Sequence, residues 1–221
     1  MSGVYRVYPK KRKNVFSDLS INTILISLNI ICFLIFLIIA SKFGWDYIAI
    51  KPSNILQGNY IWTFLTSMFM HGGIFHLFVN MISLMFVGSL VERILGKKRY
   101  FWFYLLAGLF AGLVFVLLSL IFTVDVNTYA VGASGALFGL IGFLMLVTPN
   151  LPVYAMFIPI PIKMKYAAPG MLIILWLISI AGNVPIGNTA HLGGLIAGLG
   201  YGFYLRKAYK NKVRAISRHF S

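Results

Sequence analysis

The chain has 221 residues, of which 60% are hydrophobic and only 10% are charged. Soluble domains carry about 25% charged residues and disordered chains are poor in apolar ones, so the composition excludes both classes. Lys and Arg number 19 against 4 Asp and Glu, which gives a net charge of +15, and the single cysteine, Cys32, excludes an intrachain disulfide. We therefore expect an integral membrane protein.

The apolar residues gather in runs that are long enough to cross a bilayer. A membrane-spanning helix needs about 20 mostly apolar residues. Residues 166–205 contain no charge but are too long for one crossing, and polar and helix-breaking residues interrupt them near Asn183 and Pro185. Counted as two helices, they complete a set of six predicted spans: Ile21–Ala40, Phe75–Val91, Phe101–Phe122, Tyr129–Val147, Ala167–Gly182 and Thr189–Leu205.

The basic residues lie on one side of these spans. Of the 19 Lys and Arg, all but Lys42 and Lys51 fall in the two tails or in the loops after spans 2 and 4. Cytoplasmic loops collect Lys and Arg, so both termini are expected to be cytoplasmic. The predicted organisation is a basic tail over residues 1–20, an all-α six-helix membrane domain over 21–205 and a second basic tail over 206–221.

The basic clusters also bear on partners and location. They favour anionic lipid head groups at the cytoplasmic face. Because membrane topology accounts for them, we expect no nucleic-acid partner. Nothing in the polar first 20 residues resembles a cleavable signal peptide or a transit peptide. We expect a multi-pass protein of a prokaryotic plasma membrane.

Four polar residues lie at the outer ends of predicted spans. Span 2 opens with His76 and, one turn later, Asn80; span 4 opens near Ser134 and span 6 near His191. Spans 2, 4 and 6 all run inward, so these side chains share a depth. Ionisable groups inside a bilayer are costly, so their presence there indicates a function. Helix–helix packing or a proton relay in a transporter would explain some of them singly. Their convergence favours a shared site.

Small residues predict that spans 4 and 6 pack directly together. They recur every three or four residues along both helices, which lets two backbones approach closely in lipid. In span 4 they are Gly132, Gly135, Gly139 and Gly142, and in span 6 they are Ala190, Gly194, Gly198 and Gly202. Such packing would bring Ser134 within reach of His191, as a nucleophile and its general base require.

The four acids limit the chemistry. They are Asp18, Asp46, Glu92 and Asp125, and none lies inside a span near His191. A Ser-His pair is therefore favoured over a triad, and a metal site is not expected because ligands are too few and no H-E-x-x-H occurs. No cofactor is expected. The backbone N–H of Ser134 and the side chains of His76 and Asn80 are candidate donors to an oxyanion.

Over residues 20–205 the sequence resembles the rhomboid family of intramembrane serine proteases. The resemblance rests on residues 71–80 (HGGIFHLFVN), 132–135 (GASG) and 190–194 (AHLGG), in the family's order and on its helices, and on residues 91–96 (VERILG) after span 2. It implies cleavage of transmembrane segments of membrane proteins near the outer leaflet. Ser134 would be the nucleophile, His191 the base, and His76, Asn80 and the Ser134 amide the oxyanion hole.

The resemblance also carries expectations outside the dyad. Glu92 and Arg93 would have a structural role, and His71 a structural or substrate-lining one. The outer loop before span 2 would lie partly in the membrane, and span 5 with residues 183–188 would gate access. One departure is Trp62-Thr63, where the family often has Trp-Arg. A relative that binds transmembrane segments without cutting them, and a proton-coupled transporter, are the alternatives.

Overall fold

The computed structural model is almost entirely helical, and it describes residues 19–121, 126–154, 160–182 and 186–220. The predicted gating segment lies partly outside these residues at positions 183–185, as do Asp18, Asp125 and the cations of the first tail. The long helices are α2 (Ile21–Phe43), α5 (Ile74–Ser83), a π-helical turn η3 (Leu84–Gly88), α6 (Ser89–Leu95), α7 (Lys97–Ser119), α8 (Ser134–Val147), α9 (Met164–Gly182) and α10 (Asn188–Ala208).

Shorter elements fill the connections. Residues 44–73, which we call loop 1, contain the short helices η1 (Trp45–Tyr47), α3 (Pro52–Leu56), α4 (Thr63–Thr66) and η2 (Ser67–Phe69). Between α8 and α9, strand β1 (Pro152–Val153) pairs antiparallel with β2 (Ile162–Lys163). The C-terminal segment, expected to be a tail, contains a helix, α11 (Lys210–His219), whose Val213 is buried against the bundle.

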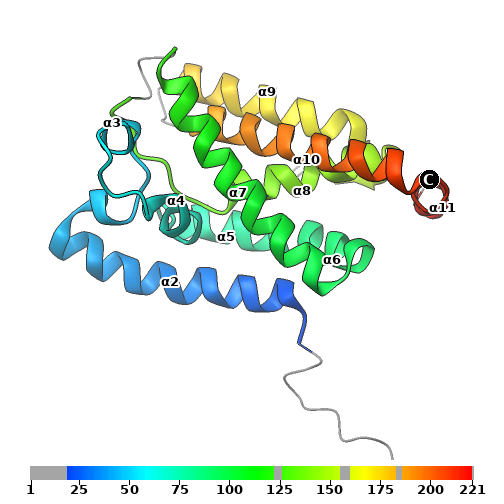
Figure 1. Cartoon of the computed structure of the whole chain (residues 1–221), viewed down its shortest axis with the longest axis horizontal. Coiled ribbons are helices and arrows are strands. Elements are labelled where there is room, and N and C mark those ends of the chain that lie inside the picture. Colours follow the sequence, from blue (N-terminus) through cyan, green and yellow to red (C-terminus); the bar gives the residue numbers. More distant parts are fainter. Residues whose placement is uncertain (1–18, 122–125, 155–159, 183–185, 221) are drawn as a thin grey trace, which may run out of the picture.

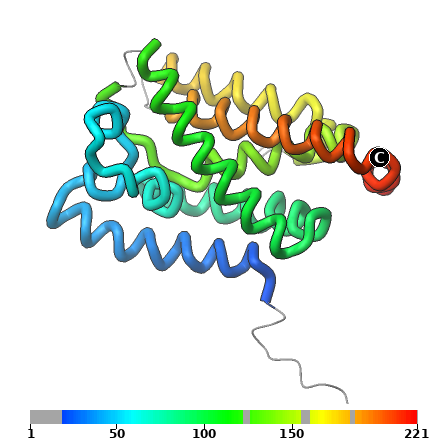
Figure 2. The backbone as a smooth tube through the Cα atoms, viewed as in Figure 1, coloured from blue at the N-terminus to red at the C-terminus, as the bar shows by residue number. Residues whose placement is uncertain are grey.

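The long helices alternate in direction, so their ends form two opposite faces of the bundle (Figure 1). Loop 1 lies at one end, and α11 and the start of α2 lie at the other; the tube drawn in Figure 2 makes the alternation easy to follow. Within the described ranges, four helical stretches are long and apolar enough to cross a membrane: α2, Ile74–Leu95, α7 and α9. The full count of six spans and the orientation of the termini stay predictions.

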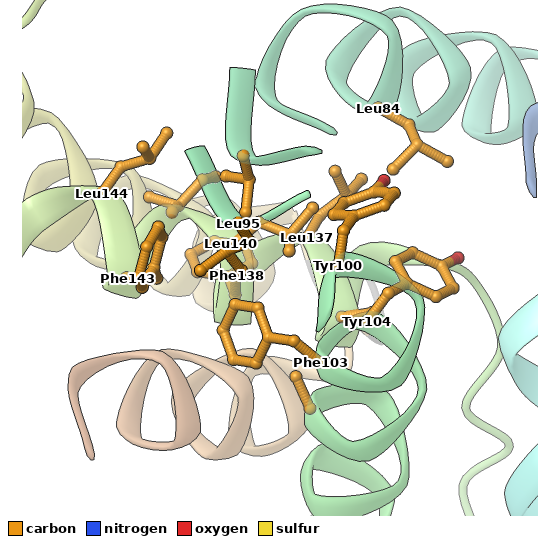
Figure 3. Close-up of a cluster of buried hydrophobic side chains, with 14 of the residues drawn as sticks. Leu84, Leu95, Tyr100, Phe103, Tyr104, Leu137, Phe138, Leu140, Phe143 and Leu144 are labelled. Carbon is orange, nitrogen blue, oxygen red and sulfur yellow. The ribbon is translucent and has the colours of Figure 1, made fainter. Parts of the chain in front are cut away.

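Helix α8 is the centre of the bundle. Every residue from Ala136 to Leu144 is buried, whereas α2 and α9 present most of their apolar side chains outward. Figure 3 shows Leu137, Phe138, Leu140 and Phe143 of α8 in one cluster with Phe103 of α7. Because α8 is buried on all sides, the helices packed around it determine its position.

Glycine determines how closely α10 approaches α8. A Cβ placed on Gly194 or Gly198 would overlap the carbonyl oxygen of Gly135 or Gly139. Gly142 faces α10 in the same way, because its Cβ would lie 2.5 Å from the Leu195 carbonyl oxygen. These two helices therefore meet backbone to backbone, and α10 packs against α8 more extensively than any other pair of elements does.

At the opposite end from loop 1, Glu92 of α6 holds the start of α2. Its carboxylate accepts hydrogen bonds from Ser20 Oγ (2.6 Å), Ile21 N (2.8 Å) and Asn22 N (3.0 Å). The first N–H groups of a helix have no partner within the helix, and a carboxylate there also interacts favourably with the helix dipole. Arg93, its neighbour in the sequence, is exposed.

Asn22 links the same region to η3 and α7. Its Nδ2 donates to the Leu84 carbonyl at 2.8 Å, and its Oδ1 accepts from the Tyr100 hydroxyl at 2.6 Å. Gly88 lies directly against both side chains, since a Cβ there would come within 2.6 Å of the Tyr100 hydroxyl oxygen. The π-helical turn thus places the Leu84 carbonyl and Gly88 against the buried Asn22. These contacts, with the bond to Tyr100, fix α2, α5–α6 and α7 relative to one another.

Gly198→Ala tests the backbone contact between α8 and α10. The added methyl must displace the Gly139 carbonyl, so we expect a loss of about 1–3 kcal/mol in the free energy of unfolding, measured in mixed micelles by titration with sodium dodecyl sulfate. Gly200→Ala is the matched control, because it lies on the same helix with no atom within 4 Å of its Cβ position. Equal effects of the two substitutions would contradict the account.

Glu92→Ala tests the capping of α2. It leaves the Ser20 hydroxyl and two backbone N–H groups without their partner, so we expect a loss of about 2–3 kcal/mol in the same unfolding measurement. Arg93→Ala, one residue along and exposed, should change stability by no more than about 0.5 kcal/mol. A stable Glu92→Ala protein would show that the carboxylate is dispensable.

Candidate active site

The structure brings Ser134 and His191 together. Ser134 is the first residue of α8 and His191 lies in the first turn of α10. His191 Nε2 is 2.8 Å from Ser134 Oγ, within hydrogen-bond distance. The two side chains come from helices whose backbones touch through glycine, so the bundle holds them in register. A serine hydroxyl that donates to an imidazole nitrogen is the arrangement that activates a serine nucleophile.

The His191 ring is oriented by packing. It is 7% exposed and stacks on Phe138 of α8, with ring centroids 4.6 Å apart and planes at 20°. Its Nδ1 has no hydrogen-bond partner among the described residues. For Nε2 to accept the Ser134 proton, Nδ1 must carry the ring hydrogen. No carboxylate in the described part of the chain takes that hydrogen, so the stacking with Phe138 holds the ring in place.

His76 lies beside the start of α8. A Cβ on Gly132 would come within 2.9 Å of His76 Cε1, 3.0 Å of Nε2 and 3.7 Å of Ser134 Oγ. Gly132 has a φ of +121°, in the region that side chains other than glycine rarely adopt. Glycine is thus required here both by conformation and by space. The Gly72 N–H donates to His76 Nδ1 at 3.3 Å, which leaves Nε2 as the N–H donor, facing the Gly132–Ser134 region.

Asn80 is buried, at 4% exposed, one turn below His76. Its Nδ2 donates to the His76 carbonyl at 2.8 Å. Among the described contacts it makes no hydrogen bond with Ser134 or His191. The bond to the backbone of the preceding turn holds the amide in place.

The Ser134 backbone N–H opens α8. Ala133 precedes it and offers no side-chain cap. The first N–H groups of a helix lack partners within the helix, so they can bind an anion. The Ser134 amide and His76 Nε2–H therefore border the same hydroxyl, while Asn80 lies one turn deeper.

His71 is fully buried rather than lining an open surface. Its ring packs edge-on against Phe33 of α2 and against His76, with centroids 6.2 Å and 5.2 Å apart. Neither ring nitrogen has a hydrogen-bond partner among the described residues. Its position is one of support behind His76. No group of three or more His, Cys, Asp or Glu in the described ranges could hold a metal ion.

Loop 1 holds the segment that leads into Ser134. Ile50 and Ala130 form an antiparallel bridge of two hydrogen bonds, 3.2 and 2.9 Å long, and the Gly132 N–H donates to the Ser67 carbonyl at 2.8 Å. These bonds determine the path of the chain through Gly132 into α8. They explain how a loop of helical turns, distant in sequence, positions Ser134.

Asp46 joins loop 1 to the same segment through side chains. Its Oδ1 accepts hydrogen bonds from Asn54 Nδ2 (2.6 Å) and the Tyr129 hydroxyl (2.8 Å), and Lys51 lies over the Tyr129 ring. Burial raises the pKa of Asp46, but these two hydrogen bonds and the charge of Lys51 outweigh burial and lower it below its ordinary value. The sequence pattern did not predict this contact, because Asp46 and Tyr129 are 83 residues apart in the chain.

Several known proteins are similar to this chain over about two thirds of its length or more. The rhomboid domain matches residues 58–208. RHOMBOID-like protein 1 of Arabidopsis thaliana is 37% identical over 167 residues, covering 73% of this chain and 39% of that protein. Rhomboid protease GluP of Bacillus subtilis is 34% identical over 152 residues, covering 67% and 26%.

A relative named as inactive also matches. Inactive RHOMBOID-like protein 8 of Arabidopsis thaliana is 34% identical over 146 residues, covering 65% of this chain and 38% of that protein. The chain spans less than half the length of these curated relatives.

Tyr129→Phe tests the contact with Asp46. Removing the hydroxyl should cost about 0.5–1 kcal/mol in the free energy of unfolding at pH 7. Because the folded pKa of Asp46 is lowered, its contribution is present above its unfolded pKa of about 3.9 and is lost as pH falls through the folded value. The native chain should therefore lose more stability than Asp46→Asn between about pH 5 and pH 3.

The control for this pair is Tyr154→Phe, which removes a hydroxyl from an exposed tyrosine away from loop 1. It should leave stability unchanged. Identical acid profiles for the native chain and Asp46→Asn would show that the carboxylate does not act in this way.

Proposed function

The chain belongs to the rhomboid family, and we propose that it is an intramembrane serine endopeptidase that cleaves transmembrane segments of other membrane proteins near the outer leaflet. The observation that carries the proposal is the 2.8 Å contact between His191 Nε2 and Ser134 Oγ. An inactive relative has no need to keep a serine hydroxyl and an imidazole in this geometry.

The proposed reaction follows from that contact. Ser134 Oγ attacks the carbonyl carbon of the scissile peptide while His191 Nε2 takes its proton. The negative charge that forms on the carbonyl oxygen is stabilised by the Ser134 N–H, His76 Nε2–H and the free Nδ2 hydrogen of Asn80. Such donors are typically worth about 10²–10³-fold in rate each. His191 then gives the proton to the leaving amine, and a water activated by the same ring hydrolyses the acyl group from Ser134.

Helix length supports a site below the membrane surface. The 14 residues of α8 extend about 21 Å, which is about 10 Å less than the apolar thickness of a bilayer. A helix of this length that reaches the far surface must begin inside the membrane. Ser134 would then lie at the depth of a substrate's transmembrane segment, and it is only partly buried, so a carbonyl group can reach it.

The chain is a multi-pass membrane protein. We place both termini in the cytoplasm and count six crossings, with α8 and α10 as spans 4 and 6. The alternation of basic and nearly uncharged connections supports this arrangement. The same residues support contact with anionic head groups at the cytoplasmic face, and transmembrane proteins are the proposed substrates. A prokaryotic plasma membrane stays a prediction.

The direct test is cleavage of a single-span protein substrate in proteoliposomes. Ser134→Ala and His191→Ala should each lower the rate by at least about 10³-fold, since nucleophile and base act as a unit. Ser119→Ala removes a buried serine from α7, and His219→Ala an exposed histidine from α11; both should keep activity.

The other outcomes separate the alternatives. If native and variant chains are equally inert on several substrates, the chain is a membrane protein that binds transmembrane segments without cutting them. Cleavage that survives Ser134→Ala would mean that another residue is the nucleophile. Proton flux that survives Ser134→Ala, in the absence of cleavage, would indicate a transporter that uses the histidines.

A further inference from the structure

A groove runs between α7 and α10 on the outside of the bundle, on the half that lies away from Ser134. Its volume is about 620 Å³. Lys98 and Arg99 form one end, Trp102 and Leu106 follow one and two turns along, and Phe110 forms the other end. The lining is therefore apolar along its length and doubly cationic at a single end.

We propose that this groove binds one anionic glycerophospholipid from the leaflet on the basic side of the protein. Lys98 and Arg99 would bind the phosphate and the anionic head group, and an acyl chain would lie along Trp102, Leu106 and Phe110. This binding site is separate from the Ser134–His191 site and goes beyond the proposed peptidase activity.

The two cations have no carboxylate partner among the described residues. Of the two acids in that part of the chain, Asp46 is in loop 1 at the opposite end and Glu92 is occupied by the start of α2. Both cations also stand in the first turn of α7, where the helix dipole disfavours positive charge. Side chains so placed favour an anion from outside the protein.

The length of the groove matches one leaflet. Residues 98 to 110 of a helix extend about 18 Å, and half the apolar thickness of a bilayer is about 15 Å. A lipid whose head group lies at Lys98 would therefore reach Phe110 near the membrane midplane. Trp102 lies one turn from the cations, the level at which tryptophan is enriched near lipid head groups.

The lining of the groove suits a hydrocarbon chain. Between the two cations and Phe110 it is made of apolar and aromatic side chains and two alanines, apart from the Tyr201 hydroxyl. Ala107 and Ala197 make the floor deep enough for a chain, because larger residues at either position would fill it.

The floor of the groove joins three helices. Phe103 of α7 packs against Tyr201 of α10 with ring centroids 4.7 Å apart, and both rings contact Phe143 of α8, at 5.6 and 5.8 Å. A lipid bound against Phe103 and Tyr201 would cover this junction. It would thereby stabilise the packing of α7 and α10 on α8.

Fluorescence quenching of Trp102 by brominated lipids tests the proposal directly. The full chain would carry Phe at the other three tryptophans, Trp45, Trp62 and Trp176, so that Trp102 alone reports. Vesicles of phosphatidylcholine would contain increasing fractions of brominated phosphatidylglycerol or of brominated phosphatidylcholine. We expect half-maximal quenching at an about tenfold lower fraction for phosphatidylglycerol, because two cations contact its head group.

Three variants test whether the preference for phosphatidylglycerol arises from the groove. Lys98→Gln with Arg99→Gln should abolish it, while Lys210→Gln with Arg214→Gln removes the same charge from exposed positions of α11 and should keep it. Ala197→Phe fills the floor without changing charge and should weaken quenching by phosphatidylglycerol severalfold.

Three results would overturn the proposal. They are equal quenching by both lipids in the native background, a preference lost equally in both charge variants, and a preference that Ala197→Phe leaves unchanged. The first would mean non-selective lipid contact, the second general surface attraction, and the third a head group bound at the rim without a chain in the groove. Because lipid contact is measured rather than proteolysis, the result is independent of whether the chain cleaves substrates.

Discussion

The backbone contact between α8 and α10 determines the rest of the site. Ser134 and His191 stand at the starts of these two helices, so the spacing of the helices sets the distance between the hydroxyl and the imidazole. Only glycine allows that spacing, since a Cβ at Gly194 or Gly198 would overlap a carbonyl of α8. In lipid, where no hydrophobic force drives helices together, such close packing supplies much of the attraction. Structure and chemistry thus depend on the same small residues.

Polar groups secure both ends of this central pair. At the basic end, Glu92 and Asn22 bind backbone groups of α2 and η3 and so fix the helices that surround α8. At the other end, loop 1 directs the chain through Gly132 into Ser134 with backbone hydrogen bonds. The α7–α10 groove lies along the remaining side. Between these two fixed ends, Ser134 stays partly exposed at the start of α8.

The sequence predicted the residues that lie in contact because their identities are unusual for a membrane interior: a serine and histidines at one depth, and glycines at regular spacing. It missed contacts that depend on tertiary structure. Asp46 and Tyr129 are far apart in the chain, and no local pattern joins them.

The expected start of span 3 at Phe101 was late, because Lys97 and Lys98 are charged yet helical. Helix α11 was missed because its basic residues were interpreted as a cytoplasmic tail, although Val213 and Ile216 lie three residues apart on one face that packs against the bundle.

The most direct test of the account is covalent labelling of the chain by a fluorophosphonate, located by mass spectrometry of its peptides. The account predicts a single modified residue, Ser134, and loss of labelling in His191→Ala, because the hydroxyl reacts only when Nε2 takes its proton. Gly200→Ala should be labelled like the native chain, and Gly198→Ala far more slowly. Modification of another residue, or labelling of Ser134 that is as fast without His191, would contradict the central claim.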